Sequence, residues 1–347
     1  MPRHPDIAGS APWLSSTETD VVTASARPES ASVASLPSLS ILETEGFSDY
    51  RLLDSGNGRK LERFGRIMVD RPEPQALWQP RLASDRWAAA HAVFTGDDEE
   101  TGDRWRRDKP VPESWPVAID NVTLLAKLGG FLHLGIFPEQ LPHWQWATEA
   151  IRRLSTGLAG ERPRVLNLFG YTGAASLIAA HAGAEVVHVD ASKKSVTWAR
   201  ENQAASKLGD APIRWIVEDA RKFVAREVRR GRTYHVILVD PPKFGRGPGG
   251  EVWELMEHLP PLLKDCSTLL APQSNIVLTA YAIRASSLSF GQLLAELLHD
   301  RAGTFDVGEL AIREHEGQRR IPTSLFARWS STEGTRRSTY GHPSHGP

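Results

Sequence analysis

The stretch RVLNLFGYTGAASLIAAHAGAEVVHVD, residues 164–190, decides the fold that we predict for this chain. It opens with an apolar run, RVLNLF, that has the length and composition of a buried strand. A helical segment follows and is expected to end at Gly183, because glycine is a common helix terminator. EVVHVD then has the pattern of a second strand. A strand, a helix and a strand in this order indicate a parallel sheet covered by helices.

The same alternation continues to about residue 330. Further apolar segments predict strands at residues 213–219, 235–240 and 275–282. Helical patterns lie at residues 192–209, 220–231, 251–270 and 290–298, the third with a break at Pro260–Pro261. Residues 305–314 and 324–330 predict an antiparallel pair on the sheet edge. The predicted fold class is therefore α/β, a Rossmann-like, doubly wound, mostly parallel sheet preceded by a small β-rich domain.

Composition divides the chain into four predicted segments. Residues 1–46 are rich in Ser, Ala, Thr and Pro, so we expect them to lack stable structure. Residues 47–140 predict a small β-rich domain with a role in substrate recognition, and residues 141–330 the α/β domain. Residues 331–347 predict a flexible tail.

The β-rich segment carries a strong turn signal, SGNG, which predicts a hairpin over residues 50–64. RIMVDRPEP, residues 66–74, predicts an edge-like strand ended by proline. Four tryptophans are spread through this part of the chain: Trp78, Trp87, Trp105 and Trp115. Two interpretations stay open for them, packing of a small core and stacking against RNA bases.

Charge and cysteine content narrow the classes of function. The net charge of -1 over 347 residues argues against binding nucleic acid through overall charge alone. Cys266 is the single cysteine, so no internal disulfide can form, and we expect a reducing, cytoplasmic compartment. No apolar run reaches the roughly 20 residues that span a bilayer, and acidic residues near the start argue against an organelle transit peptide. No membrane partner is expected, and no oligomeric state is predicted.

Polar residues stand where successive predicted strands end. In an open α/β sheet ligands bind beyond these carboxyl ends, and here the strands end on Asn167, Asp190, Asp219 and Asp240. Gly170 and Gly173 follow the first strand and allow the backbone to approach a ligand closely. A carboxylate at Asp190 suits the two hydroxyls of a ribose, and one at Asp219 suits an adenine amino group. Asp240 would then face the reacting end of the ligand.

The turn differs from a nicotinamide site. The pattern G-x-G-x-x-G is absent, and Tyr171 would crowd a pyrophosphate. A nucleoside without phosphates fits better, and S-adenosylmethionine (SAM) is the common one. The DPPKF segment fixes the backbone after Asp240, because proline restricts both its own φ and the preceding residue. Phe244 can then offer an aromatic face to a planar target, which suits a reaction that depends on in-line geometry.

NLFGYTG, Asp190, Asp219 and DPPKF together resemble class I SAM-dependent methyltransferases. With the upstream HLGIFPEQ they are similar to the branch that includes the large-subunit 23S ribosomal RNA methyltransferases. The resemblance implies a target pocket lined by Asp240, Pro241, Pro242, Lys243 and Phe244. It implies a cofactor site formed by Gln140, Asn167, Gly170, Tyr171, Thr172, Gly173, Asp190, Ala191, Ser192, Asp219 and Ala220. No spaced set of cysteines and histidines predicts a metal site.

The residue at the end of the fifth strand bears on which atom is methylated. Methylation of cytosine C5 needs a cysteine nucleophile, and the segment LTAYAIRASS, residues 278–287, has none. Tyr281 lies near the place where such a cysteine would stand, and Cys266 is interpreted as an inert core residue. We therefore expect methylation at a nitrogen or an oxygen.

The sequence favours RNA, and ribosomal RNA in particular, as the substrate. Residues 220–232 concentrate arginine and lysine, which fits either phosphate contacts or a solvated helix face. Residues 245–250, GRGPGG, predict a mobile loop over the site, and His133 is either a core residue or part of the site. A small-molecule or protein substrate, a non-catalytic nucleoside-binding module and a nicotinamide-dependent oxidoreductase remain as alternatives.

Overall fold

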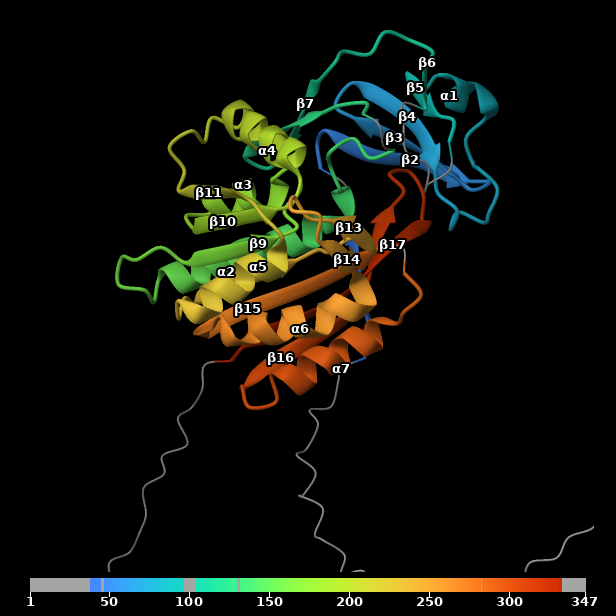
Figure 1. The fold of residues 1–347 in the computed structure, drawn as a ribbon. Helices are drawn as coiled ribbons and strands as arrows, with labels where there is room; N and C mark the ends of the chain where they lie inside the picture. Colours follow the sequence, from blue (N-terminus) through green and yellow to red (C-terminus); the bar gives the residue numbers. More distant parts are fainter. Residues whose placement is uncertain (1–37, 45–46, 97–103, 130–131, 282, 333–347) are drawn as a thin grey trace, which may run out of the picture. The chain divides into compact units, whose positions relative to one another are not determined.

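A computed structural model describes residues 38–44, 47–96, 104–129, 132–281 and 283–332 (Figure 1). Within these residues, the largest element is an eight-stranded sheet in the order β1-β16-β17-β15-β12-β9-β10-β11. Its parallel strands are β9 (Arg164–Leu168), β10 (Glu185–Asp190), β11 (Ile213–Val217), β12 (Tyr234–Val239) and β15 (Leu270–Tyr281). The predicted Rossmann-like α/β fold class is confirmed.

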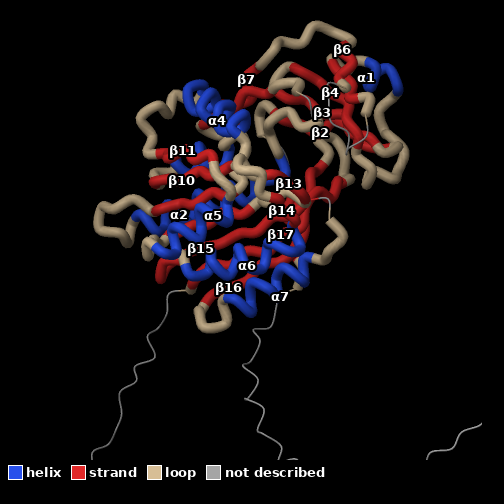
Figure 2. Tube along the Cα trace, viewed as in Figure 1, coloured by secondary structure: helices blue, strands red, loops and turns tan. Residues whose placement is uncertain are grey.

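Helices cover both faces of this sheet, as Figure 2 shows in blue against red. Alternate residues of β12 separate the two faces, because successive side chains of a strand point in opposite directions. Val236 packs with α2 and α3, whereas Ile237 packs with α5, α6 and α7. The helices are α2 (Leu141–Ser155), α3 (Ala174–His181), α4 (Lys193–Ala205), α5 (Ala220–Arg229), α6 (Leu255–Thr268) and α7 (Ser287–Leu297).

The strand order reverses between β9 and β12. The chain runs outward from β9 to β10 and β11, then returns to place β12 on the other side of β9. Ligands of open α/β sheets bind at such a reversal, beyond the carboxyl ends of the two strands. The loops that follow β9 and β12, which begin at Phe169 and Asp240, therefore lie at the favoured position for a site.

The antiparallel pair of the sheet is β16 (Gly303–Arg313) and β17 (Arg320–Ser331), as predicted. The pair does not form the edge, however, because β1 (Ser40–Thr44) adds parallel to β16. The expectation that residues 1–46 lack stable structure is thus wrong for Ser40–Thr44, and residues 1–37 lie outside the described part. A side chain at Gly308 would collide with β1, since its Cβ would lie 1.7 Å from the Ser40 carbonyl oxygen. The predicted tail, residues 331–347, is described no further than residue 332.

The β-rich part of the described chain contains a five-stranded sheet in the order β2-β3-β4-β5-β6. Its strands are β2 (Tyr50–Gly56), β3 (Arg59–Phe64), β4 (Ile67–Pro72), β5 (Ala92–Phe94) and β6 (Trp105–Arg107). The hairpin predicted around SGNG is β2–β3. The edge-like strand predicted for residues 66–74 is wrong, since β4 is central and pairs on both sides before its proline.

The tryptophans of this part favour the packing interpretation. Trp105 and Trp115 are buried in its hydrophobic core. Trp78 and Trp87 donate indole hydrogen bonds to Ser55 and Asp54 at 3.0 Å. Burial of two of the residues and the indole hydrogen bonds of the other two favour a structural role for all four.

A second sheet of the described residues, β7 (Trp115–Ile119) with β8 (Val122–Ala126), joins the β-rich part to the α/β part. Leu125 of β8 donates its N–H to the Asn202 side chain on α4 at 2.8 Å. The Trp198 indole, also on α4, donates to the Leu125 carbonyl at 2.8 Å. One hydrophobic cluster contains residues of both parts, so the two parts share a core.

Several helix boundaries differ from those predicted. Helix α4 ends at Ala205 rather than Gly209, with Lys207 in the left-handed region at a φ of 56°. Helix α6 continues through Pro260 and Pro261, so the predicted break is wrong. Both prolines are exposed, which leaves the carbonyls that lose their N–H partners on the solvent side.

Short elements complete the described part. Val252–Glu254, predicted as helix, is strand β14 and pairs with β13 (Phe244–Arg246), so the GRGPGG segment runs into the turn of a hairpin. The remaining short helices are α1 (Ser84–Ala88) and the 3-10 turn η1 (Pro138–Gln140). None of the described helices is long and apolar enough to cross a membrane.

Candidate functional site

The turn between β9 and α3 is held in an unusual backbone conformation. Phe169 and Tyr171 have φ angles of 57° and 49°, values that side-chain-bearing residues adopt rarely. A Cβ on Gly170 would lie 2.5 Å from the His188 ring, so only glycine fits there. Gly173 is the N-cap of α3 with a φ of 86°, and it has no side chain to cover the N–H groups of the first turn. The turn therefore presents backbone donors at the carboxyl end of β9.

Asp190 connects this turn to the next loop. Its Oδ2 accepts the Tyr171 N–H at 2.8 Å and its Oδ1 accepts the Ser192 N–H at 2.8 Å. Burial raises the pKa of Asp190, while the two N–H groups act in the opposite direction. Ser192 in turn caps α4 by accepting the Ser195 N–H, and Ala191 lies between the two. A carboxylate oxygen has two lone pairs, so Asp190 retains capacity for a ligand hydroxyl.

Asp219 has a structural role that the sequence did not reveal. It is the N-cap of α5, and its Oδ1 accepts the N–H groups of Arg221 and Lys222 at 2.9 and 3.2 Å. The Arg221 guanidinium pairs with its Oδ2 at 3.0 Å. Ala220, the first residue of α5, is buried behind this cap. The cap and the ion pair suffice to explain a buried carboxylate here, so its contact with an adenine remains a prediction.

Asp240 follows β12 and is clamped by Gln140. The Gln140 Nε2 donates to the Asp240 Oδ2 at 3.0 Å, and its Oε1 accepts the Thr279 hydroxyl at 3.4 Å. Removal from water, with a contribution from the nearby Glu139, raises the pKa of Asp240 to about 7. Asp240 is thus a carboxyl group that changes protonation near neutral pH, whereas an ordinary one does so near pH 4.

The residues after Asp240 form a rigid, outward-facing segment. Pro241 is buried, and the Pro242 carbonyl accepts the Trp253 indole N–H at 2.7 Å. Lys243 accepts the Leu255 N–H through its carbonyl at 3.1 Å and points its side chain to solvent. Phe244 opens β13 and is 54% exposed, an unusual state for a large apolar side chain. Its aromatic face is available to a ligand that approaches from outside.

A small cavity of about 60 Å³ lies between the turn and Asp240. It is lined by six of the predicted site residues: Gln140, Asn167, Gly170, Tyr171, Thr172 and Asp240. The other ten lie outside its lining: Gly173, Asp190, Ala191, Ser192, Asp219, Ala220, Pro241, Pro242, Lys243 and Phe244. The structure therefore brings the glycine-rich turn and Asp240 together where the strand order reverses between β9 and β12.

The same cavity contains residues that the sequence analysis missed. Phe137 and Thr279 line it, and the Gly135 carbonyl accepts the Thr172 hydroxyl at 2.6 Å. His143 also lines it, and neither of its ring nitrogens has a hydrogen-bond partner among the described residues. Burial lowers the pKa of His143 to about 3, so the ring is neutral. Its place three residues after Gln140, on the next turn of the same helical segment, is the signal that could have identified it.

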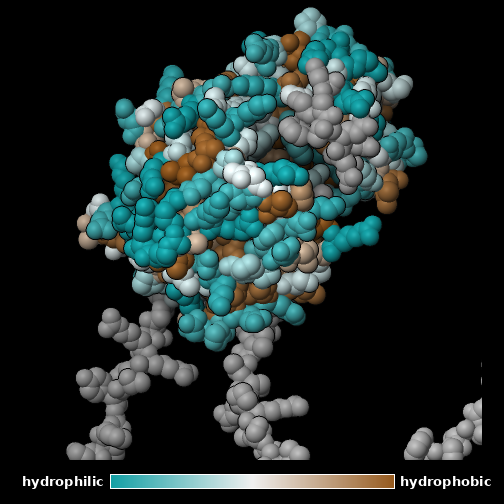
Figure 3. All heavy atoms as spheres, in the orientation of Figure 1, coloured by the Kyte–Doolittle hydropathy of each residue, from teal (hydrophilic) through white to brown (hydrophobic). Residues whose placement is uncertain are grey.

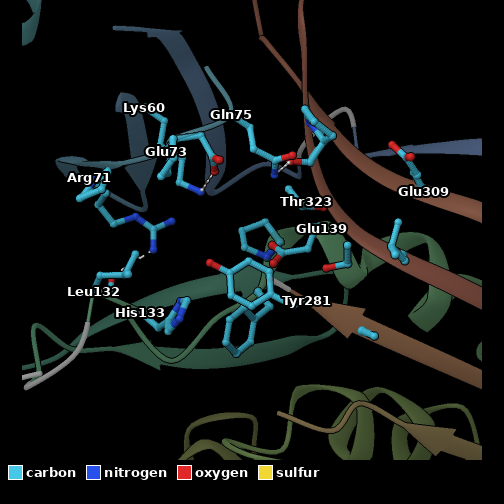
Figure 4. Close-up of a pocket in the computed structure, with 18 of the residues that line it drawn as sticks. Lys60, Arg71, Glu73, Gln75, Leu132, His133, Glu139, Tyr281, Glu309 and Thr323 are labelled. Carbon is cyan, nitrogen blue, oxygen red and sulfur yellow. Dashed lines mark hydrogen bonds and ion pairs between the residues drawn. The ribbon is translucent and has the colours of Figure 1, made fainter. Parts of the chain in front are cut away.

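A larger cavity of about 310 Å³ lies on the other side of Phe137, which lines both cavities (Figure 4). One wall comes from the β-rich part and carries Lys60, Arg71 and Glu73. The facing wall includes Glu139 of η1 and Tyr281 at the end of β15. Tyr281 was expected near the missing cysteine and lies in this cavity, whereas Cys266 is buried in the α/β core.

The basic segment of α5 is largely paired within the chain. Figure 3 shows a mostly hydrophilic surface over this helix. Four of its cations have acidic partners in the described structure, as Arg221–Asp219, Lys222–Glu251, Arg226–Glu218 and Arg230–Glu227. These pairs favour the solvated-face interpretation, and phosphate contacts of this helix remain a prediction.

Similarity to known proteins decides the family. Residues 149–275 match the family described as "Conserved hypothetical protein 95". A solved structure of a SAM-dependent methyltransferase from Agrobacterium tumefaciens is 50% identical in sequence, with a TM-score of 0.81, over 85% of this chain and 94% of that one. The chain belongs to the SAM-dependent methyltransferases.

Two curated relatives of this methyltransferase carry ribosomal names. The ribosomal RNA large subunit methyltransferase K/L of Shewanella frigidimarina is 31% identical over 155 residues, which is 43% of this chain and 20% of the relative. The ribosomal RNA large subunit methyltransferase I of Escherichia coli is 38% identical over 93 residues, 26% of this chain and 24% of the relative. The methyltransferase thus spans about a fifth to a quarter of the length of these relatives. The resemblance predicted from NLFGYTG and DPPKF is confirmed at the level of the family.

The residues where the strand order reverses, beyond the ends of β9 and β12, have the chemistry to hold SAM. Gly170 and Gly173 keep side chains out of the turn, and the first-turn N–H groups of α3 can meet a carboxylate. Asp190 lies one strand away with free acceptor capacity. The small cavity, walled by Asp240 and aromatic rings, suits the positively charged sulfonium end of the cofactor.

Proposed function

We propose that this methyltransferase transfers the methyl group of SAM to a nitrogen or oxygen atom of an RNA, with ribosomal RNA as the expected substrate. The observation that carries the proposal is the position of Asp240, which Gln140 holds in the wall of the small cavity beside the glycine-rich turn. The curated relatives, which are named for ribosomal RNA, support the choice of substrate class. The cytoplasm is the proposed compartment, because the single cysteine, Cys266, is free and buried.

Asp240 has the properties of a proton acceptor for this reaction. SAM supplies an activated methyl group, so the protein mainly has to align a nucleophile and accept the proton that it releases. Gln140 fixes one oxygen of Asp240, which leaves the other to face a substrate N–H or O–H. A pKa of about 7 lets the carboxylate accept a proton near neutral pH. No cysteine is needed for a nitrogen or oxygen nucleophile, in agreement with the buried state of Cys266.

The experiment supplies the full chain with radiolabelled SAM and total ribosomal RNA, followed by mass spectrometry of the digested nucleosides. The expected result is one new methylated nucleoside with the methyl group on nitrogen or oxygen. A methyl group on cytosine C5, or transfer to protein or small molecules and none to RNA, would contradict the proposal. The Asp240→Asn variant serves as the matched negative, since it keeps the size of the side chain and removes the carboxylate.

A further inference from the structure

The larger cavity combines buried charges with aromatic surfaces. Lys60 and Glu73 form an ion pair at 2.9 Å, and each residue is only 9% exposed. Arg71 pairs with Glu62 at 2.6 Å and donates to the Leu132 carbonyl at 3.1 Å. Figure 4 shows Lys60 and Arg71, on β3 and β4, and Glu73, just after β4, facing Tyr281 and Glu139 across the space. Burying these charges costs free energy that ion pairs alone rarely recover, which indicates a role in binding a ligand.

The opposite side of this cavity is aromatic and leads to the small cavity. His133 lies 4.8 Å from Phe137 and 6.1 Å from Tyr281 between ring centroids, and Phe137 lies 5.5 Å from Tyr171. Burial, helped by the nearby Arg71 and Lys60, lowers the pKa of His133 to about 3, so this ring is neutral and can stack. A line of four rings thus connects the larger cavity to the glycine-rich turn.

We propose that the larger cavity binds a single nucleobase of the substrate and that the Lys60–Glu73 pair reads its edge. The ammonium of Lys60 suits a ring nitrogen or carbonyl acceptor, and the carboxylate of Glu73 suits a ring or exocyclic N–H. The aromatic rings supply the stacking surfaces. This inference rests on the proposed function and assigns recognition of the target to the β-rich part, through β3 and the end of β4.

The chemistry of the cavity argues against other ligands. A phosphate would meet Glu73, Glu139 and Glu309 in the lining, and like charges repel at this range. An apolar molecule would leave the buried charges without polar contacts. A volume of about 310 Å³ is at the lower end of the roughly 300–1,000 Å³ of small-molecule sites, so it suits one base with its sugar rather than a duplex. The base would have to leave its stack to enter.

The test exchanges the two charges in the double variant Lys60→Glu/Glu73→Lys. The exchange keeps an ion pair, and hence the main stabilising contact, but reverses the order of donor and acceptor. Binding of each of the four free ribonucleosides is measured by equilibrium dialysis on the full chain saturated with S-adenosylhomocysteine. The wild-type chain should retain at least one nucleoside at millimolar concentration, and the variant should bind it roughly 10- to 100-fold more weakly. Cofactor affinity should stay within about twofold, since the pair lies outside the small cavity.

The matched control exchanges an exposed pair of the same part, Arg106→Asp/Asp108→Arg, which should bind the nucleoside as the wild type does. Should the Lys60/Glu73 exchange lower the melting temperature, Tyr281→Ala replaces it and Tyr281→Phe is its conservative partner. The alanine variant should lose about tenfold in nucleoside binding and the phenylalanine variant should keep it, because stacking needs only the ring.

The outcomes separate this inference from the proposed function. Retention of no nucleoside by the wild type would overturn the nucleobase site even if RNA is methylated. Retention equal to the wild type by the Lys60/Glu73 exchange or by Tyr281→Ala would overturn it as well. Specific retention without any methyl transfer to RNA would instead refute the proposed substrate and leave the site standing.

Discussion

The two cavities differ in how far apart their residues lie in the sequence. The small cavity contains the glycine-rich turn, residues 167–172, together with Asp240 and residues from 135–144 and 277–279. The larger cavity is assembled from β3, β4, η1, β15, β16 and β17, which span most of the described chain. A site that includes a local motif can be recognised from the sequence, whereas a site without one becomes visible only in the fold. The same difference suggests that the first site holds the common cofactor and the second the particular substrate.

The largest expected effect comes from Asp240, which lines the small cavity and is held by Gln140. Asp240→Asn should lower the rate of methyl transfer by roughly 100-fold or more, because a positioned proton acceptor contributes about that factor. Cofactor affinity, measured by calorimetry, should change by less than about threefold. Asp85→Asn, at an exposed position of α1, is the control and should leave both quantities unchanged. A normal rate in the Asp240 variant would contradict its role as the proton acceptor.

Substitution of Asp190 tests whether the first site, and not the larger cavity, binds the cofactor. Asp190→Ala should weaken SAM binding by about 1–3 kcal/mol, because ligand hydroxyls and the Tyr171 N–H both lose an acceptor. The dissociation constant is measured by calorimetry at a pH where the wild type is fully folded. Nucleoside binding in the larger cavity should be preserved, since Asp190 does not line it. Equal loss of both ligands would mean that the two cavities act as one site.

The pH dependence of the methyl-transfer rate tests the role of Asp240 as proton acceptor. The transfer rate at saturating substrate should fall about tenfold between pH 8 and pH 6, as a group with a pKa of about 7 becomes protonated. The folded chain binds the Asp240 proton more tightly than the unfolded chain does. This carboxyl therefore stabilises the fold below about pH 4, and that stabilisation is lost as the pH rises through 7. Asp240→Asn should therefore gain stability relative to the wild type at pH 8 but not below pH 4. A rate profile that is flat from pH 6 to 8 would contradict this role.

Two glycine substitutions test whether the turn after β9 requires glycine at position 170. Gly170→Ala should destabilise the fold by about 1–3 kcal/mol, because the new Cβ meets the His188 ring at 2.5 Å. Gly209→Ala is the matched control, since its Cβ would meet no atom within 4 Å, and its effect should stay below about 0.5 kcal/mol. Urea denaturation followed by circular dichroism measures both. Equal effects would show that the turn tolerates a side chain.

Much of the α/β part could be predicted because its signals are local. The apolar runs at β9, β10 and β12 and the capping residue Ser192 each act within a few positions. Their alternation was enough to place Asp190 and Asp240 at the same edge of the sheet. The family resemblance rested on the same local motifs.

The remaining features depend on contacts that the sequence does not display. Strand β1 lies in a segment of low hydrophobicity and exists through its pairing with β16. Helix α6 tolerates Pro260 and Pro261 because they face solvent, which a pattern of residues does not reveal. Asp219 was assigned to the ligand from its position, whereas the fold also uses it as a helix cap. Tyr281 and His133 were candidates from the sequence, but Lys60, Arg71 and Glu73 of the larger cavity were missed, since they meet Tyr281 only after folding.

The place of β1 has a consequence for biosynthesis. Thr44, its last residue, donates its hydroxyl to the Pro138 carbonyl at 3.1 Å, two residues from Gln140. The partner strand β16 comes long after β1 in the sequence, so β1 stays unpaired until the elements between them have been made. Non-local pairing of this kind forms slowly. Chains that stop before residue 303 would lack the strand that holds β1, and with it the contact that Thr44 makes next to Gln140.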